Sequence, residues 1–321
     1  TPEPASEPHE RWREQPITVA GDLPGLLTVP NGEGPFAVVI LVHGSGPADR
    51  DQSLGPNKPF RDIAWGLADR GIASLRYDKR SLAQPQTIAG AYTVEDEVLS
   101  DVSAAIEWLG EQVVIDSNQL YVAGLSLGGL LAPRIGTAHP SLAGLVLLAA
   151  PARGFEVIVP AQLRYIFGLD GVIDAAEAAQ LAQVDAQAAA IAHLSDASSS
   201  QPGLLGVAES YLIDLRDYDP IQTAQQLAMP MLIVQGGRDY QVTMADDFAR
   251  WQTAFAQHAT VTFRDFPNLN HLFIAGEGMA TPDEYLTQSG QVDEALISLI
   301  AEWVQQSKPR SRSAGAEHDR L

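Results

Sequence analysis

The stretch 119-QLYVAGLSLGGLLA-132 places Ser126 between a predicted strand and a predicted helix. Tyrosine and valine before the serine are typical of a strand, and the leucine- and alanine-rich residues after it indicate the start of a helix. In such a tight turn the serine hydroxyl is exposed above the sheet. Gly124 and Gly128 are needed there, because a Cβ at either position would collide with the neighbouring strand and helix. The five-residue pattern also arises by chance, so the surrounding sequence has to support it.

Strands and helices alternate along the chain on both sides of this turn. Continuous apolar runs, such as residues 36–42, are typical of parallel strands that are buried on both faces. The predicted strands are 17–20 and 26–30 at the sheet edge, then 36–42, 73–77, 119–123, 145–150, 231–235 and 260–266; the predicted helices are 60–70, 95–109, 127–132 and 292–304. This order predicts an α/β fold with a mostly parallel central sheet and helices on both faces.

One segment interrupts the alternation. Residues 151–219 contain no clear strand and include a predicted helix over 172–194, with an apolar stripe formed by Ile173, Leu181, Val184, Ile191 and Leu194. Loops that leave the carboxyl ends of strands border the ligand crevice of an open α/β sheet. We therefore expect a helical cap insertion over Ser126, although a bundle that packs aside is the alternative. The predicted core domain comprises 15–150 and 220–306, with flexible termini at 1–14 and 307–321.

The composition excludes several classes of partner and chemistry. The formal net charge of −20 argues against nucleic acid and anionic membranes as partners, since both attract basic surfaces. The longest apolar run, 142–150, is too short to cross a bilayer. The absence of cysteine excludes disulfides, thiolate catalysis and Cys-ligated zinc. The opening TPEPASEP without methionine favours a secreted or periplasmic protein over a cytoplasmic one, with a trimmed chain as the alternative. None of these features predicts an oligomeric state.

A serine hydroxyl is a weak nucleophile until a base removes its proton, so a histidine and an acid are expected elsewhere in the chain. His271 lies in 267-PNLNHLF-273, just past the carboxyl end of a predicted strand. The other histidines between Ser126 and the polar tail lie on predicted helices or before a strand. His271 is therefore the predicted base, because it lies at the same sheet edge as the serine.

The predicted acid is Asp239, in 235-QGGRDYQV-242, which follows the buried strand 231–235. This position puts a carboxylate at the catalytic edge, where it can hold the imidazole in one tautomer. Asp246 and Asp247 begin the next predicted helix, where acidic residues commonly serve the helix dipole, and Asp265 lies within a strand.

The negative oxygen that forms when a carbonyl is attacked needs two N–H donors. One is expected from Leu127, and the other from the loop 43-HGSGP-47, where Ser45 is preferred and Gly46 comes second. We also expect His43, Gly44 and Tyr240 to contact the substrate. A dinucleotide loop is excluded because position 49 is Asp instead of a third glycine, and Gly128-Gly129 lacks the lysine of a phosphate-binding loop. No motif indicates a metal site or a cofactor.

The chain closely resembles bacterial α/β-hydrolases of the esterase, dienelactone-hydrolase and serine-aminopeptidase-like branch. The resemblance covers about residues 15–306 and rests on linked motifs, namely 43-HGSGP-47, 55-GPNKPF-60, 76-RYDKR-80, 124-GLSLG-128, 235-QGGRDYQV-242 and 270-NHLF-273. It implies hydrolysis of carboxylic esters without a cofactor, but not the substrate, because this fold hosts many chemistries. Many relatives have histidine before the serine, where this chain has Leu125.

The predicted function is that of a serine carboxylesterase that acts on a small-molecule ester through an acyl-enzyme. Ser126 is the predicted nucleophile, His271 the base and Asp239 the orienting acid. An amidase or peptidase with the same three residues is one alternative. A non-catalytic binding protein with this fold is a second alternative, which the presence of all three residues disfavours.

Overall fold

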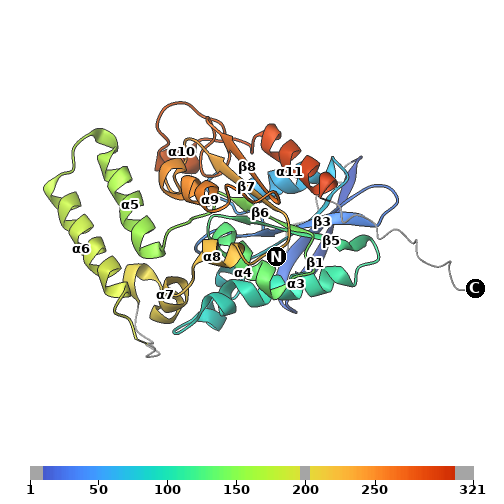
Figure 1. Ribbon diagram of the computed structural model, residues 1–321, viewed down its shortest axis with the longest axis horizontal. Helices are drawn as coiled ribbons and strands as arrows, with labels where there is room; N and C mark the ends of the chain where they lie inside the picture. The colour runs from blue at the N-terminus through green and yellow to red at the C-terminus, as the bar shows by residue number, and fades with distance from the viewer. Residues whose placement is uncertain (1–9, 196–202, 308–321) are drawn as a thin grey trace, which may run out of the picture.

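The computed structural model describes residues 10–195 and 203–307 (Figure 1). In this part of the chain, eight strands form one sheet in the order β1-β2-β4-β3-β5-β6-β7-β8. The strands are β1 (Trp12–Val19), β2 (Leu23–Pro30), β3 (Phe36–Val42), β4 (Ala73–Tyr77), β5 (Ile115–Leu125), β6 (Gly144–Leu148), β7 (Met231–Gly236) and β8 (Val261–Phe266). Strands β1, β2 and β4 pair antiparallel and the remaining pairs are parallel. The predicted mostly parallel sheet is confirmed.

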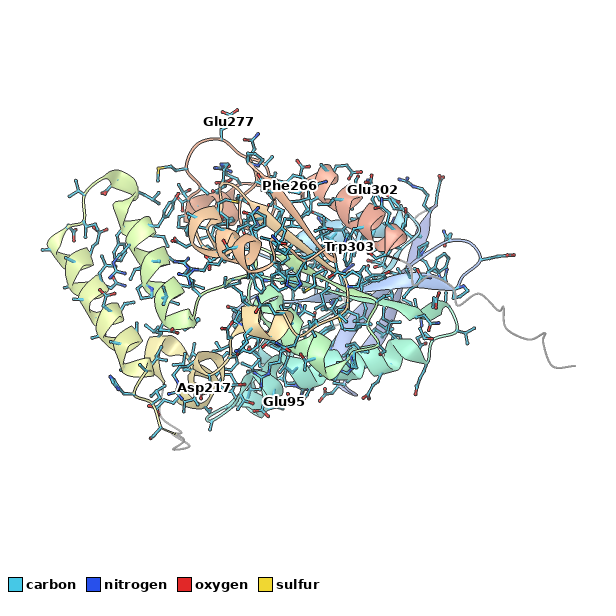
Figure 2. All side chains as sticks on the ribbon, in the orientation of Figure 1. Glu95, Asp217, Phe266, Glu277, Glu302 and Trp303 are labelled. Atoms are coloured by element: carbon cyan, nitrogen blue, oxygen red, sulfur yellow. The ribbon has the colours of Figure 1, made fainter. Side chains whose placement is uncertain are left out.

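Helices cover both faces of this sheet. The helices of the described chain are α1 (Pro59–Ala68), α2 (Arg80–Ala83), α3 (Ser100–Gly110), α4 (Leu127–Ala138), α5 (Phe155–Phe167), α6 (Ala175–Ile191), α7 (Glu209–Arg216), α8 (Pro220–Ala224), α9 (Ala249–Ala254), α10 (Pro282–Thr287) and α11 (Glu294–Gln306). Alternate strand residues point to opposite faces. In β3, Ile40 belongs to the core shared with α3, α4 and α9, whereas Leu41 belongs to the core shared with α1 and α11. Side chains fill the space on both sides, and Trp303 of α11 lies among them (Figure 2).

The amino-terminal boundary of the core lies earlier than predicted. Strand β1 begins at Trp12, whose ring stacks on Trp65 with centroids 5.3 Å apart and whose indole N–H donates to Asp69. These contacts place residues 12–14 in a strand, although the polar sequence around them predicted a flexible terminus over 1–14. Strand β2 lies between β1 and β4, so only β1 of the first two strands is at the edge. The rest of the predicted termini, residues 1–9 and 308–321, lies outside the described residues.

Residues 151–219 lie between β6 and β7 and contain helices in place of strands in their described part. Helices α5 and α6 form an antiparallel pair that projects from the body of the molecule, with α6 on the outside (Figure 1). The predicted helix over 172–194 corresponds to α6, which Asp174 and Glu177 begin with a reciprocal capping box. Helices α5 and α7 were not predicted. Proline at position 160 disguises α5, because proline normally interrupts a helix.

The turn at Ser126 depends on two close backbone approaches. Ser126 has φ 55° and ψ −115°, a strained conformation for a residue with a side chain. A Cβ built at Gly124 would lie 2.1 Å from the carbonyl oxygen of Gly128, and one built at Gly128 would lie 2.2 Å from the carbonyl oxygen of Val42. Both neighbours are main chain and cannot move without disturbing β3 or α4. The two glycines therefore let strand, turn and helix pack against one another.

We predict that Gly128→Ala lowers the free energy of unfolding by at least about 3 kcal/mol, the upper end of ordinary overpacking costs, because the clash is with backbone. Urea denaturation followed by circular dichroism measures this change. Gly110→Ala is the matched control, since the end of α3 offers open space to a new Cβ, and it should change stability by less than about 1 kcal/mol. Equal stability of the two variants would contradict the packing argument.

Candidate active site

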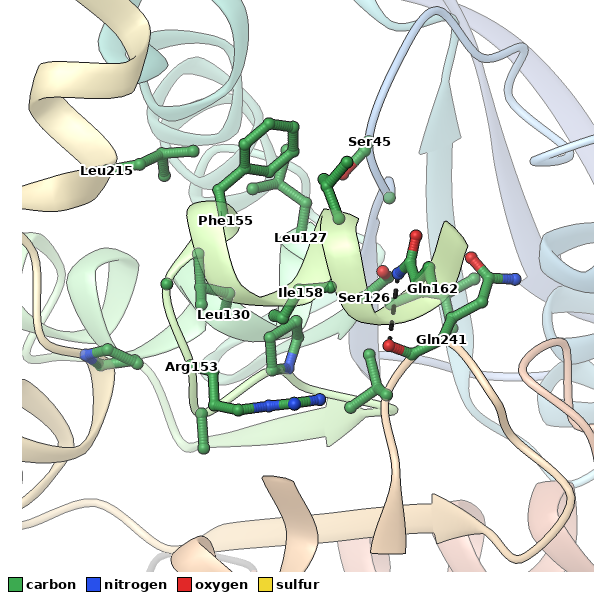
Figure 3. Close-up of a pocket in the computed structure, with 18 of the residues that line it drawn as sticks. Ser45, Ser126, Leu127, Leu130, Arg153, Phe155, Ile158, Gln162, Leu215 and Gln241 are labelled. Carbon is green, nitrogen blue, oxygen red and sulfur yellow. Dashed lines mark hydrogen bonds between the residues drawn. The ribbon is translucent and has the colours of Figure 1, made fainter. Parts of the chain in front are cut away.

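A cavity of about 730 Å³ opens at the carboxyl ends of the parallel strands, and Ser126 lies in its wall (Figure 3). Its other walls come from the loop after β3, the first part of α5, the segment from α7 to α8, and the loop that carries His271. The apolar residues Leu127, Leu130, Phe155, Ile158 and Leu215 gather along one part of the cavity. The cavity thus combines a reactive side chain with an apolar wall.

The nucleophile candidate is held by the main chain on both sides. The backbone N–H of Ser126 donates to the carbonyl of Leu148 at 2.9 Å, and its own carbonyl accepts from Leu130. Leu127 begins α4, and the first N–H groups of a helix have no acceptor within the helix. The N-terminus of α4 therefore presents main-chain donors beside the serine, where a developing negative charge is favoured.

His271 and Asp239 are in direct contact. The Nδ1 atom of His271 lies 2.7 Å from Oδ2 of Asp239, and both side chains are buried. An ionised carboxylate can only accept a hydrogen bond, so Nδ1 is the donor in this contact; in a neutral imidazole with this tautomer, Nε2 is an acceptor. His271 lines the same cavity as Ser126. The structure thus joins the predicted acid to the predicted base, and it places that base and Ser126 in the wall of one cavity.

Asp239 is fixed by donors on every side. Its Oδ1 accepts from the backbone N–H groups of Gln241 at 2.8 Å and Val242 at 3.0 Å. Its Oδ2 accepts from the side-chain amide of Gln235 at 2.9 Å in addition to His271. Gln235 in turn donates to the carbonyl of Val242 at 2.8 Å. Sequence reasoning overlooked Gln235, although its place at the end of β7, four residues before the acid, was a usable signal.

The loop that carries His271 is held by its neighbours. The side-chain oxygen of Asn270 accepts from the N–H groups of Leu272 and Ile274, while its amide donates to Glu284 at 3.1 Å. Glu284 also forms a bidentate ion pair with Arg238, the residue before Asp239; the two N···O distances are 2.7 and 2.9 Å. The loops that carry Asp239 and His271 are therefore tied to each other through Glu284 of α10.

The residues predicted to surround the substrate divide into two groups. Gly44 and Ser45 line the cavity, and a Cβ built at Gly44 would lie 3.5 Å from the Cβ of Ser126. Gly46, His43 and Tyr240 are not among the cavity residues. Tyr240 instead stacks on Tyr165 of α5, with ring centroids 4.7 Å apart and planes within 2°. Tyr240 therefore joins the loop after β7 that carries Asp239, called the acid loop below, to the insertion.

His43 lies beneath the loop and not at the cavity. Its ring packs between Phe60 and Tyr77, and Nε2 contacts the carbonyl of Asp49 at 3.0 Å. Burial, with a smaller effect from the charge of Lys79, lowers the pKa of His43 from 6.5 to about 3. His43 is therefore a neutral residue that supports the loop from inside.

The insertion faces the cavity through α5 and the segment from α7 to α8. The residues of the predicted apolar stripe over 172–194 are not among the cavity residues. Leu181 and Ile191 of α6 are buried within the insertion instead. The side chain of Gln162 in α5 donates to the carbonyl of Gln241 at 3.2 Å, which links α5 to the acid loop (Figure 3).

Asp247 has a larger role than the predicted helix-dipole contact. It is fully buried, and its carboxylate accepts from the N–H of Ala152 at 3.0 Å and from the guanidinium of Arg153 at 2.6 and 3.0 Å. These bonds fasten the first residues of the insertion to the segment that follows the acid loop. The partners are almost a hundred positions apart in the sequence, so no local pattern predicts the pair.

Among residues 10–195 and 203–307, no three His, Asp or Glu side chains converge as metal ligands. In the same residues, no helix has the length and apolar character needed to span a bilayer.

Comparison with known proteins identifies relatives of the whole fold. The BD-FAE family model matches residues 26–249. Esterase EstD of Thermotoga maritima is 41% identical over 299 residues, which cover 92% of this chain and 68% of that protein. Dipeptidyl aminopeptidase BIII of Pseudoxanthomonas mexicana is 26% identical over 249 residues, which cover 76% of this chain but only 31% of that protein.

The solved structure of Est1E from Butyrivibrio proteoclasticus has the same fold. It superposes with a TM-score of 0.56 at 17% sequence identity, and the match covers 92% of this chain and 98% of Est1E. Together with the EstD match, this agreement confirms the α/β-hydrolase resemblance that the sequence motifs indicated.

We predict that His43 makes the fold sensitive to acid. Since its pKa is lowered to about 3 in the folded chain from 6.5, only the unfolded chain gains a proton here between those values. The contribution of His43 to the free energy of unfolding is therefore fully present above about pH 6.5, and it is lost progressively as the pH drops toward 3. The loss attributable to His43 between pH 7 and pH 5 is about 2 kcal/mol.

The measurement is urea unfolding of the wild-type chain and His43→Gln at both pH values. The variant should lose about 2 kcal/mol less than the wild type over this interval. The control is His258→Gln at an exposed site, which keeps His43 and should follow the wild type. If His43→Gln and the wild type lost equal stability, His43 would have to titrate in the folded state.

Proposed function

Because this chain belongs to the BD-FAE family of α/β-hydrolases and is a carboxylesterase-type enzyme, we propose that it cleaves carboxylic esters through an acyl-enzyme on Ser126. The observation that carries the proposal is the 2.7 Å contact between His271 and Asp239, with His271 and the strained Ser126 in the wall of one cavity. This arrangement supplies a nucleophile, a base and an acid that orients the base.

In the proposed reaction, the Ser126 oxygen bonds to the ester carbonyl carbon while its proton passes to Nε2 of His271. The resulting imidazolium is stabilised by Asp239, which stays ionised. The proton then passes to the departing alcohol as the C–O bond breaks, and the acyl-enzyme remains. A water molecule repeats the sequence, with His271 first as base and then as acid, and releases the carboxylic acid.

The negative oxygen of the tetrahedral intermediate requires donors aimed at its position. We assign these to the backbone N–H groups of Leu127 and Ser45. Leu127 is at the start of α4, and Ser45 lies in the loop that passes beside Ser126. Gly46, the second choice in the sequence, is outside the cavity wall and is not assigned this role.

Residues 151–219 are proposed to act as a cap that selects the acyl group. Phe155 and Ile158 of α5 and Leu215 of α7 line the same apolar part of the cavity as Leu127 and Leu130. An apolar wall favours an apolar acyl group over a charged one, since burying an unpaired charge is costly. The cap therefore supplies part of the pocket, whereas the core domain supplies the reacting groups.

A peptidase or amidase with the same machinery is the second candidate, favoured by the match to the dipeptidyl aminopeptidase. A panel of nitrophenyl esters, anilides and aminoacyl amides separates the two. We expect kcat/KM for esters to exceed that for amides of the same acyl group. The reverse order would assign the chain to the peptidases.

We predict that Ser126→Ala lowers kcat/KM for a nitrophenyl ester on the order of a million-fold, as does loss of the nucleophile in comparable triads. Asp239→Asn should lower it roughly ten-thousand-fold, because the amide holds the wrong tautomer of His271. Each variant should keep its thermal unfolding midpoint near that of the wild type. A fluorophosphonate probe should label Ser126 and no other serine.

The controls are Asp246→Asn and Asp265→Asn, which alter exposed carboxylates outside the cavity. Both should retain nearly full activity. If one of these were inactive while Asp239→Asn turned over normally, the acid would be misassigned. Substantial activity in Ser126→Ala would reject the acyl-enzyme itself.

A further prediction concerns the cap. Truncation of Phe155 or Ile158 to Ala should change the preference between short and long acyl chains. The ratio of kcat/KM for the two chain lengths should change by a factor that corresponds to about 1–3 kcal/mol of transition-state free energy. Labelling of Ser126 by the probe should remain. Ile173→Ala is the matched control, since this exposed residue lies before α6 and away from the cavity. An unchanged chain-length profile in the Phe155 and Ile158 variants would move specificity to the loop 47–60.

A further inference from the structure

A buried lysine lies behind the loop that follows β3. The side chain of Lys79 is 2% exposed, and its ammonium donates to the carbonyl oxygens of Gly44 at 3.0 Å and Gly46 at 3.1 Å. Its third contact is with Oε1 of Glu97 at 3.2 Å. An ammonium group has three N–H donors and no acceptor. These three partners therefore use its full hydrogen-bonding capacity, and none of them is substrate.

The contact with Gly44 sets the direction of the next N–H. In a planar trans peptide, the C=O of one residue and the N–H of the next point to opposite sides. The Gly44–Ser45 bond is trans, and the carbonyl of Gly44 faces Lys79. The N–H of Ser45 consequently points away from the lysine. Gly44 and Ser45 line the cavity that also contains Ser126, so this N–H lies on the loop beside the proposed nucleophile.

The second carbonyl contact has a different effect. Gly46 is followed by Pro47, which has no N–H, so holding the Gly46 carbonyl cannot aim a donor. It anchors the far end of the same turn. The N–H of Gly44 is already bonded to the side chain of Gln52 at 3.1 Å. The peptides compared are His43–Gly44, Gly44–Ser45 and Gly46–Pro47. Among these three, Gly44–Ser45 is the one through which Lys79 can direct a donor at the cavity.

Glu97 provides the charge that a buried ammonium requires. Burial lowers the pKa of Lys79, and the Glu97 carboxylate opposes that change. Glu97 lies in the π-helical turn η2 (Glu95–Leu99), a local irregularity of a kind often found at functional sites. Its Oε2 accepts from the hydroxyl of Tyr211 in α7 at 2.8 Å. The lysine, the glutamate and the cap are thus joined by consecutive bonds.

We propose that Lys79 is a positioning residue that aims the Ser45 N–H at the oxyanion, with Glu97 as its counter-charge. This inference rests on the proposed acyl-enzyme mechanism, in which Ser45 supplies the second donor. Lys79 acts through the Gly44–Ser45 peptide and never touches the reacting atoms. A donor fixed in advance stabilises the transition state without reorganising during the reaction.

A neighbouring ion pair offers a matched control. Arg80 follows Lys79 directly, and Asp101 lies four residues after Glu97; their side chains are joined by bonds at 3.1 and 3.2 Å, and Asp101 is buried. Within the described chain, neither of these side chains bonds to residues 43–48. The two pairs thus share chemistry and location but differ in contact with the loop.

The experiment compares Lys79→Met/Glu97→Gln with Arg80→Met/Asp101→Asn. Both double variants remove the two charges of a pair together, because leaving one buried charge unpaired is strongly destabilising. The Lys79→Gln/Glu97→Gln variant replaces the first if methionine prevents folding. Measured quantities are the thermal midpoint, kcat and KM for a nitrophenyl ester, and Ki of a trifluoromethyl ketone with the same acyl group, which adds to Ser126 as a tetrahedral oxyanion.

We expect the Lys79/Glu97 variants to lose roughly 10- to 100-fold in kcat, with KM within about threefold of the wild type, because a misaligned donor weakens the transition state selectively. The ketone Ki should rise by the same factor as kcat/KM falls. The Arg80/Asp101 variant should lower the thermal midpoint but leave kcat and Ki near wild-type values. This split distinguishes positioning from structural support.

Wild-type kcat and Ki in a folded Lys79/Glu97 variant would overturn the proposal. So would an equal loss of kcat in the Arg80/Asp101 variant, which would reveal a general packing effect. Failure of the acyl-enzyme mechanism has a separate signature, namely activity in Ser126→Ala or no inhibition of the wild type by the ketone. An inactive Ser126→Ala with unaffected lysine variants would reject the role of Lys79 alone.

Discussion

Two positions without side chains let β3, the end of β5 and the start of α4 approach one another, and the whole site depends on that approach. A Cβ at Gly128 would lie 2.2 Å from the Val42 carbonyl, and one at Gly124 would meet Gly128 itself. With the three segments in contact, Ser126 is left at φ 55° in the turn between them. The loop after β3 then passes beside the serine, so nucleophile and main-chain donors share one small region.

Much of the core could be predicted because its signals are local. Buried parallel strands are continuous apolar runs, and their order along the chain puts each strand's carboxyl end at the same edge of the sheet. That rule was enough to select Asp239 and His271, which the structure places 2.7 Å apart. The glycines at 124 and 128 identified the turn for the same reason, since the constraint acts between near neighbours in sequence.

The remainder depends on pairs that no local pattern reveals. Lys79 and Glu97 form part of one buried network, yet each alone resembles an ordinary surface charge in the sequence. Tyr240 was expected at the substrate, but its stacking partner Tyr165 comes from α5, a helix hidden by its internal proline. The apolar stripe of α6 could be recognised as helical but not oriented, because the face that it packs against was itself unpredicted.

The link between Gln162 and Gln241 gives the cap a mechanical connection to the chemistry. Gln241 accepts from Gln162 in α5 through its carbonyl and donates to Asp239 through its N–H, so one residue bears on both. Under the proposed mechanism, a substrate too bulky for the pocket would displace α5 and, through this bond, Gln241, whose N–H bonds to Asp239. On that mechanism, an oversized ester would therefore lose turnover as well as affinity, because the same displacement would misalign Asp239.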